Sequence, residues 1–340
     1  MDCLGDGRKR FLVVAIGGGG DIATATMLSA SLEESGRGVV LASVAWERYV
    51  YDPVPGPIRL EEIVNPVRKS EHYVLIGEDS YALRGGRKLI FQAAKIPRLV
   101  KKNLYVVDMW GGVKGYVKAL EEIAEEEGVD LVIGVDVGGD SLATGSEDNL
   151  WSPLADWVGL AAISRVRGVL AVHSPGSDGE LDQQYVIQRI DYYARKGGLL
   201  CARAMSSRDA NLLEKILGHV NSEASKISLL AARGVRGTVE MRLGSRKVDI
   251  TIFSLFTFLL DSAMVAESIQ PVKEIINTET LDEARRILNS MGIYTELDLE
   301  EDLYRQGVTP DKLDGKILLE TWTNGQNRLR NKRLLGEGEG

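Results

Sequence analysis

The stretch Phe11-Leu-Val-Val-Ala-Ile-Gly-Gly-Gly-Gly-Asp21 decides the fold class of this chain. Its apolar first half predicts a short β-strand, and its run of glycines predicts a tight turn. An amphipathic segment, typical of a helix, continues from there through Glu34. A strand, a tight turn and a helix in this order begin a βαβ unit, which places parallel strands in one sheet.

The same alternation of short apolar runs and helical patterns continues along the chain. Residues 39–46 are almost continuously apolar, as in a central strand that is covered on both faces. A strong helical pattern over residues 115–128 carries many glutamates on its expected solvated face. Further strand candidates are residues 72–76, 104–108, 131–136, 169–173 and 199–204. The pattern predicts an α/β fold with a three-layer, doubly wound, mostly parallel sheet of Rossmann-like type.

The C-terminal third departs from this alternation. Residues 238–243 and 246–251 predict a β-hairpin around Gly244-Ser245. The apolar residues 250–260 predict a buried core helix, which is too short for a bilayer span of about 20 residues. We expect residues 1–277 to form a single α/β domain. Residues 278–340 predict a charged helical extension, with a helix over residues 281–291 and a disordered end at residues 336–340.

Composition limits the classes of function. The formal net charge of the 340 residues is -8, whereas general nucleic-acid binders carry a basic face, so we expect no nucleic-acid partner. The apolar run at residues 11–16 is shorter than a secretory signal core, and no segment predicts a membrane span, so we expect a cytoplasmic protein. A small anionic ligand fits this charge. The hairpin and the apolar segment over residues 238–260 could form the interface of a homo-oligomer.

The glycine loop after the first strand is the first candidate site. Its N–H groups and the positive end of the following helix dipole suit a phosphate. The spacing Gly18-x-Gly20-x-x-Ala23 also fits a relaxed dinucleotide fingerprint, with Glu47 where a ribose-binding acid is expected. A tight turn that only allows close helix packing is the alternative. The predicted ligand-binding residues of this loop are Gly17, Gly18, Gly19, Gly20 and Asp21.

Polar and aromatic residues follow two other strands. Arg48 could clamp a phosphate or a carboxylate with two hydrogen bonds. In the alternative, Glu47 and Arg48 pair only with neighbouring surface charges. Trp46 and Trp110 could wall a base or a ring, although tryptophans more often belong to the core. We therefore predict that Glu47 and Arg48 bind the ligand.

An acidic, glycine-rich stretch runs from Gly134 to Asp148, where the strand at residues 131–136 continues into a loop. Carboxylates at such spacing commonly hold Mg²⁺, and small neighbouring residues leave them open to a ligand. The turn propensity of aspartate and glycine is the alternative explanation. The predicted metal ligands are Asp136, Asp140 and Glu147, and Gly138 and Gly139 are predicted to contact the ligand.

A related loop, Ser174 to Glu180, follows the strand at residues 169–173. Gly176 is predicted to contact the ligand here. The predicted catalytic acid and base groups are Asp140, Asp178 and Glu180. Both acidic loops serve one site only if Asp136 and Asp178 lie at the same edge of the sheet.

Several of these motifs together resemble an uncharacterised family of archaeal hypothetical proteins. The motifs are Gly17 to Asp21, Trp46-Glu47-Arg48, Asp52-Pro-Val-Pro-Gly-Pro57, Asp136-Val-Gly-Gly-Asp140 and Gly176-Ser-Asp-Gly-Glu180. The resemblance covers most of the chain to about residue 265. Because that family carries only a domain-of-unknown-function label, it implies the α/β fold and an archaeal source but no activity. The loop from Asp136 is also similar to the Asp-Gly-Gly-Asn loop of D-glutamate cyclase-like domains, with Asp140 in place of the asparagine.

Three hypotheses of function follow. The first is a metal-assisted hydrolase, lyase or phosphoryl-transfer enzyme, which binds Mg²⁺ and a small phosphorylated metabolite or nucleotide between the glycine loop and the acidic loops. No lysine of a Walker A motif follows the glycines, so an ordinary P-loop enzyme is not expected. The second is an oxidoreductase that uses NAD(P) or a flavin through Gly18, Gly20 and Glu47. The third is a non-catalytic ligand-binding or assembly protein.

Overall fold

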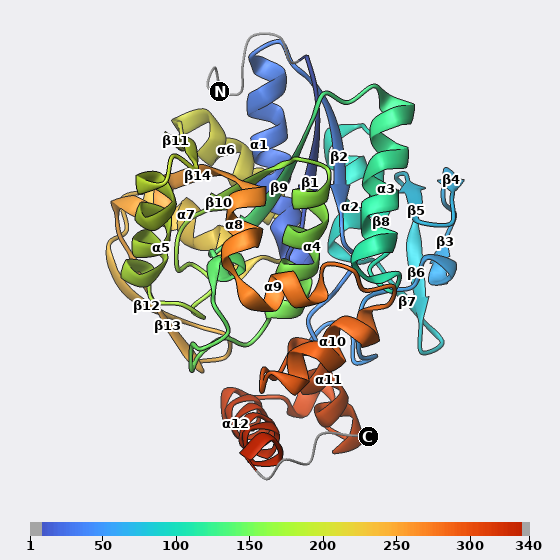
Figure 1. Ribbon diagram of the computed structural model, residues 1–340. Coiled ribbons are helices and arrows are strands. Elements are labelled where there is room, and N and C mark those ends of the chain that lie inside the picture. The colour runs from blue at the N-terminus through green and yellow to red at the C-terminus, as the bar shows by residue number, and fades with distance from the viewer. Residues whose placement is uncertain (1–8, 335–340) are drawn as a thin grey trace.

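The computed structural model describes residues 9–334, and a nine-stranded sheet lies at the centre of this part of the chain (Figure 1). The strand order across the sheet is β11-β14-β10-β9-β1-β2-β8-β5-β4. The strands are β1 (Arg10–Ala15), β2 (Gly38–Ser43), β4 (Arg68–Lys69), β5 (Tyr73–Ile76), β8 (Leu104–Val107), β9 (Leu131–Val137), β10 (Val169–His173), β11 (Leu199–Ala204) and β14 (Phe256–Asp261).

The centre of the sheet is parallel and doubly wound. Strand β1 pairs in parallel with β2 on one side and β9 on the other, and these pair in turn with β8 and β10. The order β8-β2-β1-β9-β10 therefore runs outward from β1 in both directions, which confirms the predicted doubly wound, Rossmann-like fold. Strands β14, β11, β5 and β4 add antiparallel pairs at the two edges. Strand order reverses between β1 and β9, where such folds bind ligands.

Helices cover both faces of the sheet and complete the three layers. Because successive side chains of a strand point to opposite faces, Leu12 and Val14 pack in one core and Phe11 and Val13 in another. The helices of the first core are α3 (Gly112–Glu127), α4 (Pro153–Arg165), α5 (Gln183–Arg195), α8 (Ser262–Ser268), α9 (Gln270–Ile275) and α10 (Leu281–Ser290). The helices of the second core are α1 (Ile22–Glu34), α2 (Gln92–Val100) and α6 (Ser207–Leu217).

The expected core helix over residues 250–260 is wrong. A short 3-10 turn, Ile252–Leu255, leads into β14, which is inserted between β10 and β11. Thr257 and Leu259 are buried on one side of this strand, and Phe256 and Phe258 are half-buried on the other. A strand that is covered on both faces is apolar throughout, and a short apolar run of this kind has no period that separates it from a helix.

Other expected elements have clear counterparts. The predicted hairpin is confirmed as β12 (Gly237–Met241) and β13 (Arg246–Ile250), which pack against α7 (Glu223–Ala232). A small antiparallel sheet of β3 (Ile63–Val64), β6 (Tyr81–Arg84) and β7 (Arg87–Leu89) was not expected. Within residues 9–334, every helix is too short or too polar to cross a lipid bilayer.

The C-terminal helices lie beyond the carboxyl ends of the parallel strands (Figure 1). Leu281 and Leu288 of α10 belong to the same core as α3 and α4. After α10 come α11 (Glu296–Arg305) and α12 (Gly315–Leu334), and Trp322 of α12 stacks on Trp151 at 5.1 Å between ring centroids. The expected disordered end at residues 336–340 lies outside the described residues.

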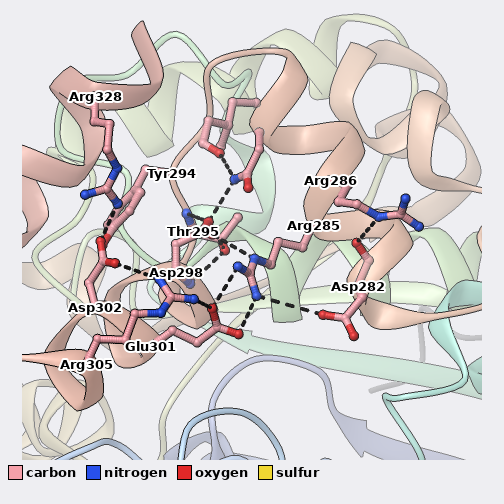
Figure 2. Close-up of polar contacts among 12 residues, drawn as sticks. Asp282, Arg285, Arg286, Tyr294, Thr295, Asp298, Glu301, Asp302, Arg305 and Arg328 are labelled. Carbon is pink, nitrogen blue, oxygen red and sulfur yellow. Dashed lines mark hydrogen bonds and ion pairs between the residues drawn. The ribbon is translucent and has the colours of Figure 1, made fainter. Parts of the chain in front are cut away.

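A network of ion pairs holds these helices together (Figure 2). Arg285 of α10 donates to Asp298 at 2.7 Å and to Glu301 at 2.7 Å, both on α11. Asp302, also on α11, accepts from Arg328 of α12 at 2.5 Å. Because each of the three helices is tied to a neighbour, they form one wall beside the sheet.

Candidate functional site

A cavity of about 230 Å³ opens where the strand order reverses. Loops that follow β1, β2, β9 and β10 line its inner part. The tip of the β12–β13 hairpin, the starts of α2, α4 and α7, and residues of α11 and α12 also line it. The carboxyl ends of the parallel strands therefore build this site, as expected for the fold.

Buried carboxylates from three separate segments meet beside the cavity, and two of them, Asp21 and Asp156, line it. Asp21, Asp136 and Asp156 each place one oxygen within 4.8 Å of the others, which is an arrangement that can hold a metal ion. Asp136 accepts hydrogen bonds from the N–H groups of Gly139 at 3.0 Å and Ser141 at 3.3 Å. Among the described residues, Oδ1 of Asp156 has no hydrogen-bond partner although it is buried. An unpaired buried carboxylate oxygen is costly unless a cation or a ligand compensates it.

Burial strongly disfavours charge on this group. It raises the pKa of Asp21 and Asp156 well above the usual range, and the neighbouring Asp136 raises both further. Burial also raises the pKa of Asp136, although hydrogen bonds from Ser141 oppose the shift. A bound cation would favour the charged form of all three groups. A bound metal ion would therefore offset the repulsion among these carboxylates and the cost of burying their charges.

Gly17 makes room for these carboxylates. A Cβ atom at this position would lie 2.5 Å from Oδ2 of Asp21 and 2.8 Å from Oδ1 of Asp156. The next glycine, Gly18, is exposed and has open space at the same position. Gly17 therefore leaves space for the carboxylates, and Gly18 faces the cavity.

The predicted metal ligands are only partly brought together. Asp136 lies in the carboxylate group, and Asp140 lines the cavity with a pKa that burial and then Asp156 raise well above its usual range. Glu147 points elsewhere, because it accepts from the N–H groups of Thr144 at 2.8 Å and Gly145 at 2.8 Å and is not among the residues that line the cavity.

Sequence reasoning missed Asp156 as a member of this group. It lies in the first turn of α4, where the surrounding residues are buried on every side of the helix. A single acid within an otherwise apolar helix was the signal, because buried acids are rare unless they are paired or bind metal.

The two acidic loops lie side by side. Strands β9 and β10 are parallel neighbours with Asp136 opposite Val172, so both loops leave the same edge of the sheet. The N–H of Gly176 donates to the carbonyl of Gly138 at 2.6 Å. A Cβ atom on Gly138, whose φ is 132°, would lie 2.0 Å from Oδ2 of Asp178. Gly138 therefore lets the second loop close over the first.

The other two predicted loop glycines also serve packing. A Cβ atom on Gly139 would lie 2.6 Å from the side chain of Val186. On Gly176 it would lie 2.8 Å from the backbone of Gln183. Both contacts are with α5, so these glycines set the distance between the loops and that helix.

Asp178 and Glu180 have different environments. Oδ1 of Asp178 accepts from the N–H of Glu180 at 2.8 Å, whereas its buried Oδ2 has no partner within residues 9–334. Burial, and then the charge of Glu180, raise the pKa of Asp178 to about 7. A carboxyl group with this pKa can exchange a proton near neutral pH.

Glu180 accepts several hydrogen bonds and pairs with an arginine. It accepts from the N–H groups of Trp151 at 2.7 Å and Ser152 at 2.8 Å, and it pairs with Arg246 at 3.1 Å. Burial alone would raise its pKa, but Arg246 and then Arg242 hold the pKa of Glu180 below its usual value. Glu180 therefore lines the cavity as an anion that contacts both Arg246 and the backbone of Trp151.

In the described part of the chain, the arginines that line the cavity are Arg48, Arg242 and Arg246. Arg246 is buried over the ring of Trp151, 4.3 Å from its centroid. Its Nη2 and the Nε of Arg242 are buried without hydrogen-bond partners among residues 9–334. Arg48 pairs with Glu223 of α7. Sequence reasoning missed Arg242 and Arg246, because only the folded hairpin brings them to the strand ends.

Glu47 is fully engaged within the protein. Its carboxylate accepts from the backbone N–H of Gln92 at 2.8 Å and from the side-chain amide of Gln92 at 2.9 Å. Gly19 donates to the carbonyl of Trp46 at 2.8 Å. A Cβ atom on Gly20 would lie 3.1 Å from Oγ of Ser222. These contacts fix the glycine loop between the β2 loop, α2 and the start of α7.

Comparison with known proteins identifies a family of unknown function. No curated protein and no solved structure matches the chain significantly. The family described as "Protein of unknown function (DUF1152)" matches residues 12–304, from β1 to the last turn of α11. This range contains the carboxylate group, the acidic loops and the hairpin, and it confirms the expected relationship to a family of unknown function. The chain belongs to the DUF1152 family.

Proposed function

We propose that this protein is a metal-assisted enzyme that acts on a small phosphorylated metabolite or nucleotide. The observation that carries the proposal is one cavity with two unlike walls. Asp21 and Asp156 line the cavity and form, with the fully buried Asp136, a group that can hold a cation. Arg242 and Arg246 bring unpaired buried nitrogens to the same cavity. A divalent cation together with arginines is the usual protein environment of a phosphoryl group.

Mg²⁺ is the cation that we propose for the carboxylate group. Its oxygen ligands and its preference for sites shared with substrate phosphates fit the donors present. When bound, such an ion would neutralise phosphate charge and favour ionisation of a water molecule.

The protein side chains would have distinct tasks in this enzyme. Arg246 and Arg242 would bind phosphoryl oxygens, because guanidinium groups donate in a fixed, forked geometry. Asp178, with its unpaired oxygen and its pKa of about 7, would act as the general acid or base that exchanges a proton with the substrate or with water. Hydrolysis, lyase chemistry and phosphoryl transfer all use these parts.

The dinucleotide hypothesis receives less support from the contacts. The ribose-binding role required a free carboxylate at Glu47, and both of its oxygens accept from Gln92. Asp21 also places a carboxylate oxygen in the metal-type group, close to where the pyrophosphate would bind. A non-catalytic ligand-binding protein would use the same cavity without turnover.

The test of this proposal is binding followed by turnover. The purified protein is titrated with inorganic phosphate in the presence of Mg²⁺, Mn²⁺ or EDTA, and the melting temperature is recorded. Phosphate release is then measured on a panel of sugar phosphates and nucleotides. We expect phosphate to raise the melting temperature only when the metal is present, and we expect turnover of at least one compound. Asp178→Asn should lose turnover. Asp156→Asn should lose metal binding. Metal-independent behaviour throughout would reject the proposal, and binding without turnover would favour the non-catalytic alternative.

A further inference from the structure

The tip of the β12–β13 hairpin is held in an unfavourable backbone conformation. Arg242 and Leu243 have φ angles of 55° and 58°, in the left-handed region that glycine and asparagine tolerate best. The N–H of Gly244 donates to the carbonyl of Met241 at 3.1 Å, so Arg242 and Leu243 are the central residues of a tight turn. Met241 pairs with Arg246, so residues 242–245 form the loop between the strands. Turns with positive φ at both central residues normally carry glycine, asparagine or aspartate there.

Both strained residues line the cavity. The N–H of Arg242 donates to Glu223, which also pairs with Arg48. Helix α12 begins directly against the tip, because a Cβ atom on Gly315 would lie 2.5 Å from the carbonyl oxygen of Leu243. Strained residues that the surrounding structure holds in place occur preferentially at functional sites. Contacts with the rest of the protein therefore hold the tip in a backbone conformation that Arg242 and Leu243 do not favour by themselves.

Leu243 belongs to an apolar end of the cavity. This end is formed by the β2 loop, α11, α12, the segment before α12 and the hairpin tip, and its residues are Tyr49, Tyr51, Leu243, Leu299, Leu313 and Leu318. Four of them, Tyr49, Leu299, Leu313 and Leu318, pack in one hydrophobic cluster. The other two are open to solvent, since Leu243 is 55% exposed and Tyr51 is 45% exposed. Exposed apolar side chains at the rim of a cavity are typical of a binding site for apolar groups.

We infer that the ligand is a phosphate monoester of an apolar alcohol. Its phosphate would lie between Arg246 and the carboxylate group, and its hydrocarbon part would occupy the apolar end of the cavity. Arg242 and Leu243 would contact the junction, with the guanidinium toward the phosphate and the leucine against the hydrocarbon. This inference rests on the proposed function and adds the class of alcohol to it.

A homologous series of ligands tests the inference. Affinities of the full chain for inorganic, methyl, butyl and hexyl phosphate are measured calorimetrically in excess Mg²⁺. Because a buried methylene group contributes about 0.8 kcal/mol, the affinity is expected to rise by about fourfold per methylene until the apolar end is filled. The quantity compared between variants is the ratio of the hexyl to the inorganic phosphate affinity.

Leu243→Asn is the informative variant. Asparagine tolerates the left-handed conformation, so the melting temperature should rise, while the hexyl-to-inorganic affinity ratio should fall severalfold. Leu319→Asn is the matched control, because Leu319 is similarly exposed, at 49%, and is not among the residues that line the cavity. Its affinity ratio should equal that of the unmodified protein.

The failures are distinguishable. If the protein binds inorganic and hexyl phosphate equally well, the inference is wrong and the proposed function stands. If Leu243→Asn lowers the melting temperature and leaves the ratio unchanged, the tip is structural and the inference is wrong as well. If no phosphate of the series binds in Mg²⁺, both the inference and the proposed function fall.

Discussion

Arg246 and Glu180 form a buried ion pair, with Nη1 and Oε1 3.1 Å apart and side chains only 5% and 0% exposed. The arginine comes from the hairpin, and the glutamate comes from the loop after β10. Removing one partner of a buried pair leaves an uncompensated charge, which costs about 3–5 kcal/mol.

Glu180→Gln should therefore lower the free energy of unfolding by roughly 3 kcal/mol, as measured by urea denaturation. The double variant Glu180→Gln, Arg246→Met should recover much of this loss, because neither charge remains buried. A double variant as unstable as Glu180→Gln alone would show that the hydrogen bonds to Trp151 and Ser152, and not the ion pair, carry the effect.

Asp156→Asn should abolish stabilisation by Mg²⁺. In the unmodified protein, a metal concentration of 100 times its dissociation constant should add about 2.7 kcal/mol to the free energy of unfolding. Asp148→Asn is the control, because the Asp148 carboxylate is 84% exposed. Glu147→Gln separates the two candidate sets of ligands. Glu147→Gln should retain metal binding. If Glu147→Gln lost metal binding and Asp156→Asn retained it, the carboxylate group would not be the metal site.

Adjacent glycines should respond differently to alanine. Gly17→Ala places a methyl group 2.5 Å from Asp21 and should cost about 1–3 kcal/mol of stability together with metal binding. Gly18→Ala should fold normally, because φ of -63° suits alanine and nothing lies within 4 Å. Thermal unfolding of both variants with and without Mg²⁺ measures the difference. Equal behaviour of the two would contradict the crowding at Gly17.

Glu300 should make stability fall as pH rises. Burial raises its pKa from 4.5 to about 8, although hydrogen bonds from Gly56 and Trp46 oppose the shift. Between pH 4.5 and about pH 8, Glu300 keeps its proton in the folded protein and releases it in the unfolded chain. The free energy of unfolding therefore decreases with increasing pH in this window, by at most about 1.4 kcal/mol per pH unit.

Glu300→Gln should remove this contribution. Urea denaturation at pH 5, 6, 7 and 8 should give a flatter dependence for the variant than for the unmodified protein. Glu296, whose pKa burial also raises to about 8, retains its own contribution in both proteins. Parallel pH profiles would show that Glu300 is ionised in the folded protein across the whole range.

Local patterns predicted most of the architecture. Residues 11–21 predicted β1, its glycine turn and the following helix, because period and turn chemistry are properties of neighbouring residues. The same reasoning failed at β14. That strand is apolar on both faces because it contributes to both cores, with Leu260 in the first and Leu259 in the second, and a uniform apolar run carries no period.

The sequence by itself determined the doubly wound α/β class and the glycine and acidic loops at the strand ends. It did so because strand period, glycine turns and clustered acids are all local signals. Only the tertiary structure decided which acids meet and which cations face them. Asp156 reaches Asp21 and Asp136 through the packing of α4, and Arg242 and Arg246 reach the cavity through the fold of the hairpin. These contacts join segments that are far apart in the chain, and a local sequence pattern contains no information on the distance between such segments in space.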